Sequence, residues 1–347
     1  IRGRIIRLTI GIYGPMADAV GRKKPLVIGV AIFLAATVAA SLAPTIGWLI
    51  AARAVQGLGA ATLMAVPRAV IRDMATGPAA AKMMAAIMIV ISVSPMLAPL
   101  TGSAVMAWGS WREIFAVLAG AALLSLGLIL FALPETLPAH RRRPVRLAVM
   151  TAGARRLLAD RRFLGLTMIG GFGMASFFVF LASASFVYTR QYGLSPTGFS
   201  LAFAGECHRL LHRLAIRRPA GERFGMERVI SLAITGFAGL SLALTLVVLA
   251  GFDALAVVIA GLFLANACLG VGDAHGHGHV AGPHPDIAGL ASSLGRHLQM
   301  LTGGLMIAAT GPFLDNTVLT MAPAITLCAA LAWAAAAASL PRLRLLA

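Results

Sequence analysis

Residues 14–25 have the sequence GPMADAVGRKKP, and this short polar stretch lies directly before a long apolar run. It combines one acid, Asp18, with a helix-breaking glycine, Gly21, and three consecutive cations that begin at Arg22. Cations gathered in a short gap beside an apolar run are typical of a cytoplasmic loop between two membrane helices. The stretch therefore predicts a helical membrane protein and sets the side of the membrane on which this loop lies.

The composition of the chain supports a membrane fold independently of this loop. Hydrophobic residues make up 59% of the 347 residues, and charged residues only 12%. The apolar runs are about 20 residues long, which is the length that a helix needs to cross the hydrocarbon core of a bilayer. The net charge of +17 comes from cations in the gaps between these runs, so we interpret them as topology signals and exclude a nucleic-acid surface.

Hydropathy predicts nine clear membrane crossings. Two further crossings are partial, because residues 5–16 look like the end of a shortened helix and residues 197–216 begin apolar and then turn basic. The nine clear crossings lie at residues 25–44, 48–67, 83–107, 113–133, 163–188, 229–250, 253–271, 287–312 and 318–340.

The longest polar gap divides the predicted helices into two bundles. We expect an N-terminal helical bundle at residues 1–133, a cytoplasmic linker at residues 134–162 and a C-terminal helical bundle at residues 163–347. Residues 221–225 of the second bundle place an acid three positions before a glycine, as Asp18 and Gly21 do in the first. This echo indicates an internal repeat, which is the usual construction of secondary transporters.

The gaps between the crossings alternate in charge when both partial crossings are counted. One side of the membrane then holds twenty cations and the other only Arg112 and Arg190. The positive-inside rule places the basic side, with the linker and the C-terminus, in the cytoplasm. The twenty cations are Arg22, Lys23, Lys24, Arg68, Arg72, Lys82, Arg141, Arg142, Arg143, Arg146, Arg155, Arg156, Arg161, Arg162, Arg217, Arg218, Arg223, Arg228, Arg342 and Arg344.

The loop at residues 14–25, the residues around Arg53 and the residues around Pro95 and Pro99 occur in an order and spacing that resemble the major facilitator superfamily. Within that family the chain resembles the Bcr/CflA group of drug:proton antiporters, and the resemblance covers nearly all of its residues. Residues 14–24 look like the signature loop between the second and third helices of that family. The resemblance implies that Asp18, Gly21, Arg22 and Lys23 clamp neighbouring helix ends on the cytoplasmic side and help to control the outward-to-inward switch. The alternative is a charged loop that only obeys topology.

A second motif surrounds Arg53, which lies inside an apolar span. A cation there costs about 3 kcal/mol or more on insertion scales, so it normally faces a polar interior and marks a functional site. Arg53, Gln56 and Gly57 match the fourth-helix motif of the family, and the resemblance implies a role for Arg53 in proton coupling. The alternative is that Arg53 extends to the nearby membrane interface.

A third motif places Pro95, Pro99 and Gly102 in one predicted crossing. Each proline removes a backbone donor, so we expect a kinked helix whose freed carbonyls find other partners. The spacing resembles the antiporter motif of the fifth helix in the Bcr/CflA group, and a purely structural kink is compatible with that interpretation. Trp111–Phe115 and Leu133–Leu137 also match the beginning and end of the sixth helix of the group.

The chain departs from the family pattern in several places. The family has twelve helices, and we expect that the first helix and most of the second are absent here. No acid lies deep in a clear crossing, so the sequence identifies no carboxylate that carries the proton. Residues 206–219 and 272–282 are too polar for their positions, and they become apolar when the back-translated codons are read one nucleotide earlier. We therefore hypothesise compensating frameshifts in the gene or its reported sequence.

The histidines of the second irregular stretch, His275, His277 and His279, leave metal binding as an alternative, together with His284. Alternation with glycine gives a flexible tract without a preset tetrahedral site, and the stretch reads apolar in the shifted frame, so we predict no metal site. The three cysteines, Cys207, Cys268 and Cys328, are isolated and form neither a disulfide framework nor a metal motif.

The sequence thus predicts a multi-pass protein of the bacterial inner (plasma) membrane that exports drugs or other small amphipathic compounds in exchange for protons. Its partners are a small-molecule substrate, protons and the lipid bilayer, with no nucleic acid, and the proton gradient takes the place of a cofactor. An inactive remnant of such a transporter is the alternative. An enzyme is not expected, because no nucleophile elbow, HExxH motif or paired intramembrane acid is present.

Overall fold

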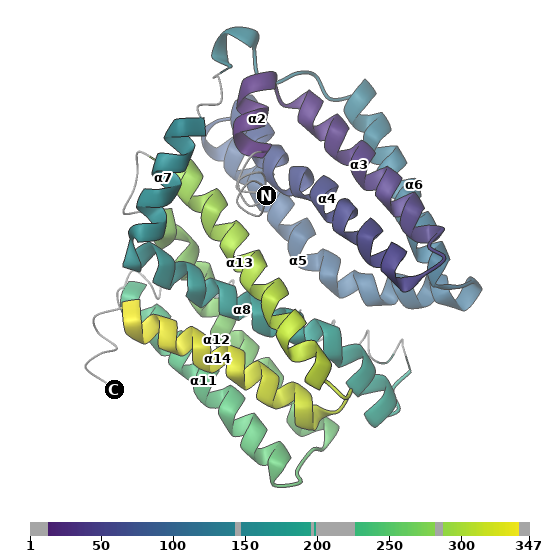
Figure 1. Ribbon diagram of the computed structural model, residues 1–347, viewed down its shortest axis with the longest axis vertical. Coiled ribbons are helices and arrows are strands. Elements are labelled where there is room, and N and C mark those ends of the chain that lie inside the picture. The colour runs from purple at the N-terminus through teal and green to yellow at the C-terminus, as the bar shows by residue number, and fades with distance from the viewer. Residues whose placement is uncertain (1–12, 143–146, 196–197, 199–225, 282–286, 340–347) are drawn as a thin grey trace. The chain divides into compact units, whose positions relative to one another are not determined.

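The computed structural model describes residues 13–142, 147–195, 198, 226–281 and 287–339. Every regular element among these residues is a helix, which confirms the predicted all-helical fold. The chain divides into two compact units, Ile1–Arg146 and Leu147–Ala347, and Figure 1 shows the helices of each. The boundary between the units falls inside the polar gap at residues 134–162.

The first unit is built around one helix, α3, which packs against two others. In Figure 1, α3 lies between α4 and α6, and both make extensive contacts with it. Helix α4 also contacts α2 and α5. The elements of this unit are α2 (Tyr13–Val20), α3 (Lys23–Ser41), α4 (Ile46–Met74), α5 (Gly77–Trp108), α6 (Trp111–Phe131) and the short turn η1 (Ala139–Arg141).

Polar side chains near the C-terminal end of α3 cap the first turns of α4 and α6. The hydroxyl of Thr45 accepts a hydrogen bond from the backbone N–H of Trp48 and so caps the start of α4. Ser110 and Glu113 form a capping box at the start of α6. The guanidinium of Arg112 donates to the carbonyl of Ala43 at 3.1 Å, which joins the loop between α3 and α4 to the start of α6.

The second unit is centred on α8, which packs against α13 and α14. Helix α11 packs against α12 and α14, so α14 contacts helices on two sides. Its largest buried cluster includes Val179, Tyr188, Val258, Met321 and Cys328. The elements are α7 (Leu147–Ala159), α8 (Arg161–Phe186), the π turn η2 (Val187–Gln191), α11 (Met226–Leu249), α12 (Leu255–Ala281), α13 (Ala288–Thr310), η4 (Gly311–Phe313) and α14 (Val318–Ser339).

Each of the nine predicted crossings coincides with one long helix of the described residues. Six of these helices are long and apolar enough to span a bilayer, within the part of the chain that the structure describes: those at Lys23–Ser41, Ile46–Met74, Trp111–Phe131, Arg161–Gln191, Arg228–Leu249 and Val318–Ser339. The chain is therefore a multi-pass membrane protein. The partial crossing at 197–216 falls outside the described residues apart from Gly198.

Two helices extend several residues beyond the predicted crossings. The prediction ended the second crossing at Pro67, but α4 continues through Pro67 to Met74. A proline removes a single backbone donor, and a long packed helix tolerates that loss. The prediction also started the third crossing at residue 83, whereas α5 begins at Gly77 with a proline in its first turn, a position where the missing N–H costs nothing.

Candidate functional site

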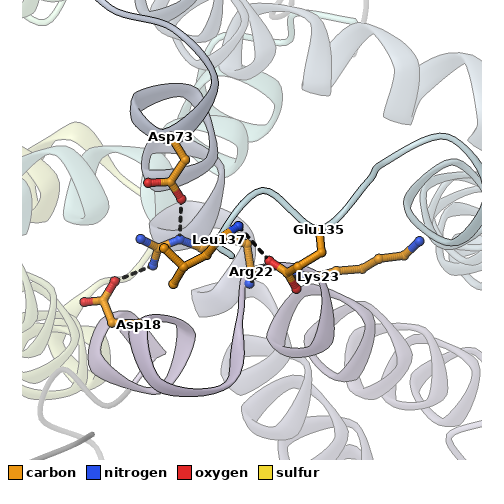
Figure 2. Close-up of polar contacts among 6 residues, drawn as sticks. All are labelled: Asp18, Arg22, Lys23, Asp73, Glu135 and Leu137. Carbon is orange, nitrogen blue, oxygen red and sulfur yellow. Dashed lines mark hydrogen bonds and ion pairs between the residues drawn. The ribbon is translucent and has the colours of Figure 1, made fainter. Parts of the chain in front are cut away.

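A charged cluster lies where α2, α3, α4 and the segment after α6 meet, and its centre is Arg22. This side chain is only 7% exposed, although arginine is among the most solvent-exposed residue types. Its Nη1 donates to Asp18 Oδ1 at 2.5 Å, and its Nε donates to Asp73 Oδ2 at 2.7 Å. Figure 2 shows the guanidinium between the two carboxylates. The cluster therefore ties α2 and α4 to the start of α3.

The local backbone explains why Arg22 reaches both acids. Helix α2 ends at Val20, and Gly21 adopts a φ of +98°, a left-handed conformation that glycine adopts at the lowest cost. The chain reverses there, and Arg22 becomes the residue that precedes α3. Asp18 occupies the last turn of α2 and Asp73 the last turn of α4, so both carboxylates lie at the same end of the unit.

Glu135 adds a second layer to the cluster from the segment that follows α6. Its carboxylate accepts hydrogen bonds from the backbone N–H of Arg22 at 2.7 Å, of Lys23 at 3.2 Å and of Leu137 at 3.0 Å. The first two donors lie at the start of α3 and have no partner within the helix, so Glu135 caps α3 (Figure 2). The ammonium of Lys23 donates to the carbonyl of Leu130 and completes the link to α6.

Gly21 is also required by the position of Glu135. A Cβ atom added at Gly21 would lie 2.4 Å from Oε2 of Glu135, a distance that forces the carboxylate to move. The glycine therefore has two functions: it permits the positive φ, and it leaves room for the acid that caps α3.

The electrostatics of the cluster follow from these contacts. Burial by itself would lower the pKa of Arg22, but the hydrogen bonds and charges of Asp73 and Asp18 outweigh it and raise the pKa above the ordinary value. Burial by itself would raise the pKa of Glu135, but three backbone N–H donors, together with the charge of Arg142, outweigh it and lower the pKa. Both shifts favour the charged forms of Arg22 and Glu135.

A second polar group lies within the membrane span of α4 and is built around Arg53. Its Nη1 donates to the side-chain oxygen of Gln56 at 2.6 Å, and the guanidinium lies 5.9 Å from the centre of the Phe115 ring. Gln56 is 3% exposed, and its amide donates to the hydroxyl of Thr37 on α3 at 2.6 Å. Thr37 donates in turn to the carbonyl of Phe33. The polar chain therefore crosses from α4 to α3.

The surroundings of Arg53 differ from those of Arg22. Arg53 is exposed on the first unit, and none of the carboxylates in the described residues forms an ion pair with it. It lies seven residues after the first residue of α4, about 10 Å along the helix axis. Its charge is thus held inside a membrane span by a neutral amide and an aromatic ring.

Two glycines of the Arg53 motif have different surroundings. A Cβ added at Gly57, which the sequence selects, would meet no atom within 4 Å. A Cβ added at Gly59 would lie 2.6 Å from the carbonyl oxygen of Gly29 and from the backbone N of Phe33. Gly59, which sequence reasoning missed, is therefore the residue that lets the backbones of α3 and α4 approach closely.

The third predicted motif lies in α5. The helix continues from Gly77 to Trp108 through both Pro95 and Pro99 as one element. A Cβ added at Gly102 would meet no atom within 4 Å, and the hydroxyl of nearby Thr101 donates to the carbonyls of Leu97 and Ala98. The role of Pro95, Pro99 and Gly102 in antiport stays a prediction.

The metal alternative falls largely outside the described side chains. The backbone of His275, His277 and His279 belongs to α12, their side chains are not described, and His284 is outside the described residues. Among the residues that were searched, none of the clusters of His, Cys, Asp and Glu has the three members needed to hold a metal ion. The frameshift hypothesis for residues 206–219 and 272–282 likewise stays a prediction.

Sequence comparison identifies the family and several relatives of this chain. A family model described as the Major Facilitator Superfamily matches residues 8–294. An uncharacterized MFS-type transporter, YdgK, of Bacillus subtilis is 38% identical over 205 residues, which are 57% of this chain and 50% of the relative. A bicyclomycin resistance protein homolog of Haemophilus influenzae is 26% identical over 85% of this chain and 74% of its own length.

A third relative is the multidrug resistance protein MdtL of Vibrio parahaemolyticus, which is 27% identical over 55% of this chain and 48% of its own length. The chain therefore spans about half the length of two of these three relatives. Among solved structures, a D-xylose–proton symporter superposes with a TM-score of 0.70 at 17% identity, covering 94% of this chain and 84% of the symporter. At that identity the superposition describes the fold alone.

Proposed function

Because the chain belongs to the Major Facilitator Superfamily, we propose that it exports drugs or other small amphipathic compounds across the inner membrane in exchange for protons. The names of the relatives support this substrate class, since they include a bicyclomycin resistance protein homolog and a multidrug resistance protein. The basic end of the first unit lies on the cytoplasmic side in this proposal, as the positive-inside rule requires.

The observation that carries the proposal is the charge of Arg53 inside α4. An arginine in a membrane span is costly, and here a neutral amide and an aromatic ring, with no carboxylate among the described residues, surround it. Such a cation is available to repel a proton or to attract an anion as the transporter changes state. In this proposal the positive charge of Arg53 disfavours a proton in the span in one state of the cycle and disfavours it less in the other.

The Arg22 cluster acts as a latch in the same proposal. Its ion pairs join α2 to α4 through the residue that starts α3, and Glu135 joins that point to the end of α6. The ion pairs of this cluster are either formed or broken. A latch of this kind therefore favours two distinct conformations of the transporter over a gradual change between them. Asp18, Gly21, Arg22 and Lys23 are the switch residues, with Asp73 and Glu135 as partners.

Transport measurements on the full chain test this function. The purified protein is reconstituted in liposomes that contain a pH-sensitive dye, and bicyclomycin or a lipophilic cationic dye is added to one side. Drug-driven movement of protons in the opposite direction is the expected result. Drug movement that ignores an imposed pH gradient would exclude proton exchange, and absence of both movements in folded protein would favour the alternative of an inactive remnant.

A further inference from the structure

Helix α7 is held against the second unit by a tight contact. A Cβ added at Gly153 would lie 2.7 Å from a methyl group of Leu290, and Leu157 of the same helix is fully buried. The chain then turns at Asp160, whose carboxylate accepts the backbone N–H of Arg162 at 2.8 Å and so caps α8. Both contacts fix α7 at the end of the unit where α8 enters its membrane span.

The outward side of this corner carries arginines. Arg155 and Arg156 on α7 and Arg161 and Arg162 on α8 are all exposed, and a single acid, Asp160, lies within this segment. Leu158, between the two pairs, is 42% exposed. An exposed leucine among arginines is typical of a helix that lies in the interface between water and lipid.

Two of these cations, Arg155 and Arg161, are not explained by the contacts of the described residues. Arg161 and Arg162 occupy the first turn of α8, where the helix dipole disfavours positive charge. Among the described residues, Arg155 and Arg161 form no ion pair with a carboxylate. Arg155 and Arg161 are therefore exposed cations close in the chain to the point where a membrane helix begins.

We infer that the corner formed by α7 and the start of α8 binds the phosphate groups of anionic phospholipids. Guanidinium groups bind phosphate through paired hydrogen bonds, and an exposed leucine beside them is positioned to enter the acyl boundary. Lipid fits better than a soluble anion because the site adjoins a membrane span. The inference requires the membrane fold but does not depend on drug export.

The test compares the full chain in nanodiscs of phosphatidylcholine with nanodiscs that also contain phosphatidylglycerol. We expect a higher thermal midpoint with the anionic lipid, and the double variant Arg155→Gln/Arg161→Gln should lose most of that increase while keeping its midpoint in phosphatidylcholine. Binding of phosphatidylglycerol, measured by native mass spectrometry, should weaken roughly thirtyfold in this variant. Each arginine near an anionic surface contributes about 1 kcal/mol to binding, and the variant removes two of them.

The matched control is Arg72→Gln/Lys82→Gln, which removes the same charge from exposed positions of the first unit. It should keep the lipid response of the unchanged protein. An equal loss in both variants would show that general surface charge is responsible and would overturn the inference. Stabilisation by inorganic phosphate in phosphatidylcholine nanodiscs, equal to that by phosphatidylglycerol, would also overturn it, because the site would then bind free anions.

Discussion

Arg22 and Arg53, both in the first unit, differ in burial and in the groups that surround their charge. Arg22 is buried between two carboxylates, and its backbone is capped by a third. Arg53 is exposed within a membrane span and meets the amide of Gln56 and the ring of Phe115. The two residues share the same chemistry, but Arg22 is paired with two carboxylates, whereas Arg53 forms no ion pair with a carboxylate of the described residues.

This difference separates a structural role from a coupling role. Removal of one partner from a buried ion pair is costly, so the pairs of Arg22 hold α2, α3 and α4 together in the state where the latch is closed. A cation without a carboxylate affects any proton or anion that comes near, so Arg53 is suited to sense the transported species. Substitutions at the two sites should therefore have different effects on stability and on transport.

The largest effect on stability is expected for Arg22→Ala. Removal of a buried partner leaves Asp73, whose side chain is 20% exposed, facing Asp18, which is 52% exposed, without a cation between them. We expect a loss of roughly 3 kcal/mol, at the lower end of the range for broken buried pairs because Asp18 is half exposed. The thermal midpoint in detergent measures it. Arg72→Ala, at an exposed position beside Asp73, is the control and should change the midpoint little.

The next effect concerns the α3–α4 contact that positions Gln56 against Thr37. Gly59→Ala places a methyl group 2.6 Å from backbone atoms of α3, so the helices must separate. We expect a loss of about 1–3 kcal/mol, the usual cost of overpacking. Gly57→Ala, two residues away in open space, should be nearly neutral. Equal midpoints for the two variants would contradict the assigned packing.

A smaller and pH-dependent effect is expected for Glu135→Gln. The pKa of Glu135 lies below its ordinary value of 4.5, so its cap stabilises the folded state above that value and is lost as the pH falls through the lowered pKa. The variant should be less stable than the unchanged protein by about 1 kcal/mol at neutral pH. The difference should disappear in acid, and thermal midpoints measured over a pH series check it. A difference that persists below the lowered pKa would show that Glu135 acts through its shape and not its charge.

The sequence predicted the helices well and the site less completely. Apolar length identifies a crossing, so the nine long helices of the described residues were predicted. Helix α4 continues past the predicted crossing through Arg68 and Arg72, because hydropathy marks where apolar residues end and not where a helix ends. Asp18 and Arg22 were predicted together because they lie four residues apart on one loop. Asp73 was not, since nothing in its own neighbourhood indicates a partner 51 residues away.

Two other residues of the site, Glu135 and Gly59, were not selected from the sequence, and only the first could have been. Glu135 follows α6 at the same end of the bundle as residues 14–25, so an acid there is a candidate cap once the alternation of helix ends is considered. Gly57 and Gly59 cannot be separated in this way, because only the crossing of α3 and α4 shows which glycine faces the other backbone. Hydropathy therefore identifies a membrane helix but does not show which of its residues face a neighbouring helix.

The most direct measurement of the central claim is proton movement driven by drug in liposomes that contain Arg53→Ala, with its thermal midpoint measured in parallel. The account predicts a midpoint close to that of the unchanged protein together with loss of drug-driven proton movement, because Arg53 couples and does not hold the fold. Unchanged coupling in the folded variant would remove Arg53 from the mechanism. A collapse of the midpoint would instead show that Arg53 and Arg22 have the same structural role, and the contrast between them would be wrong.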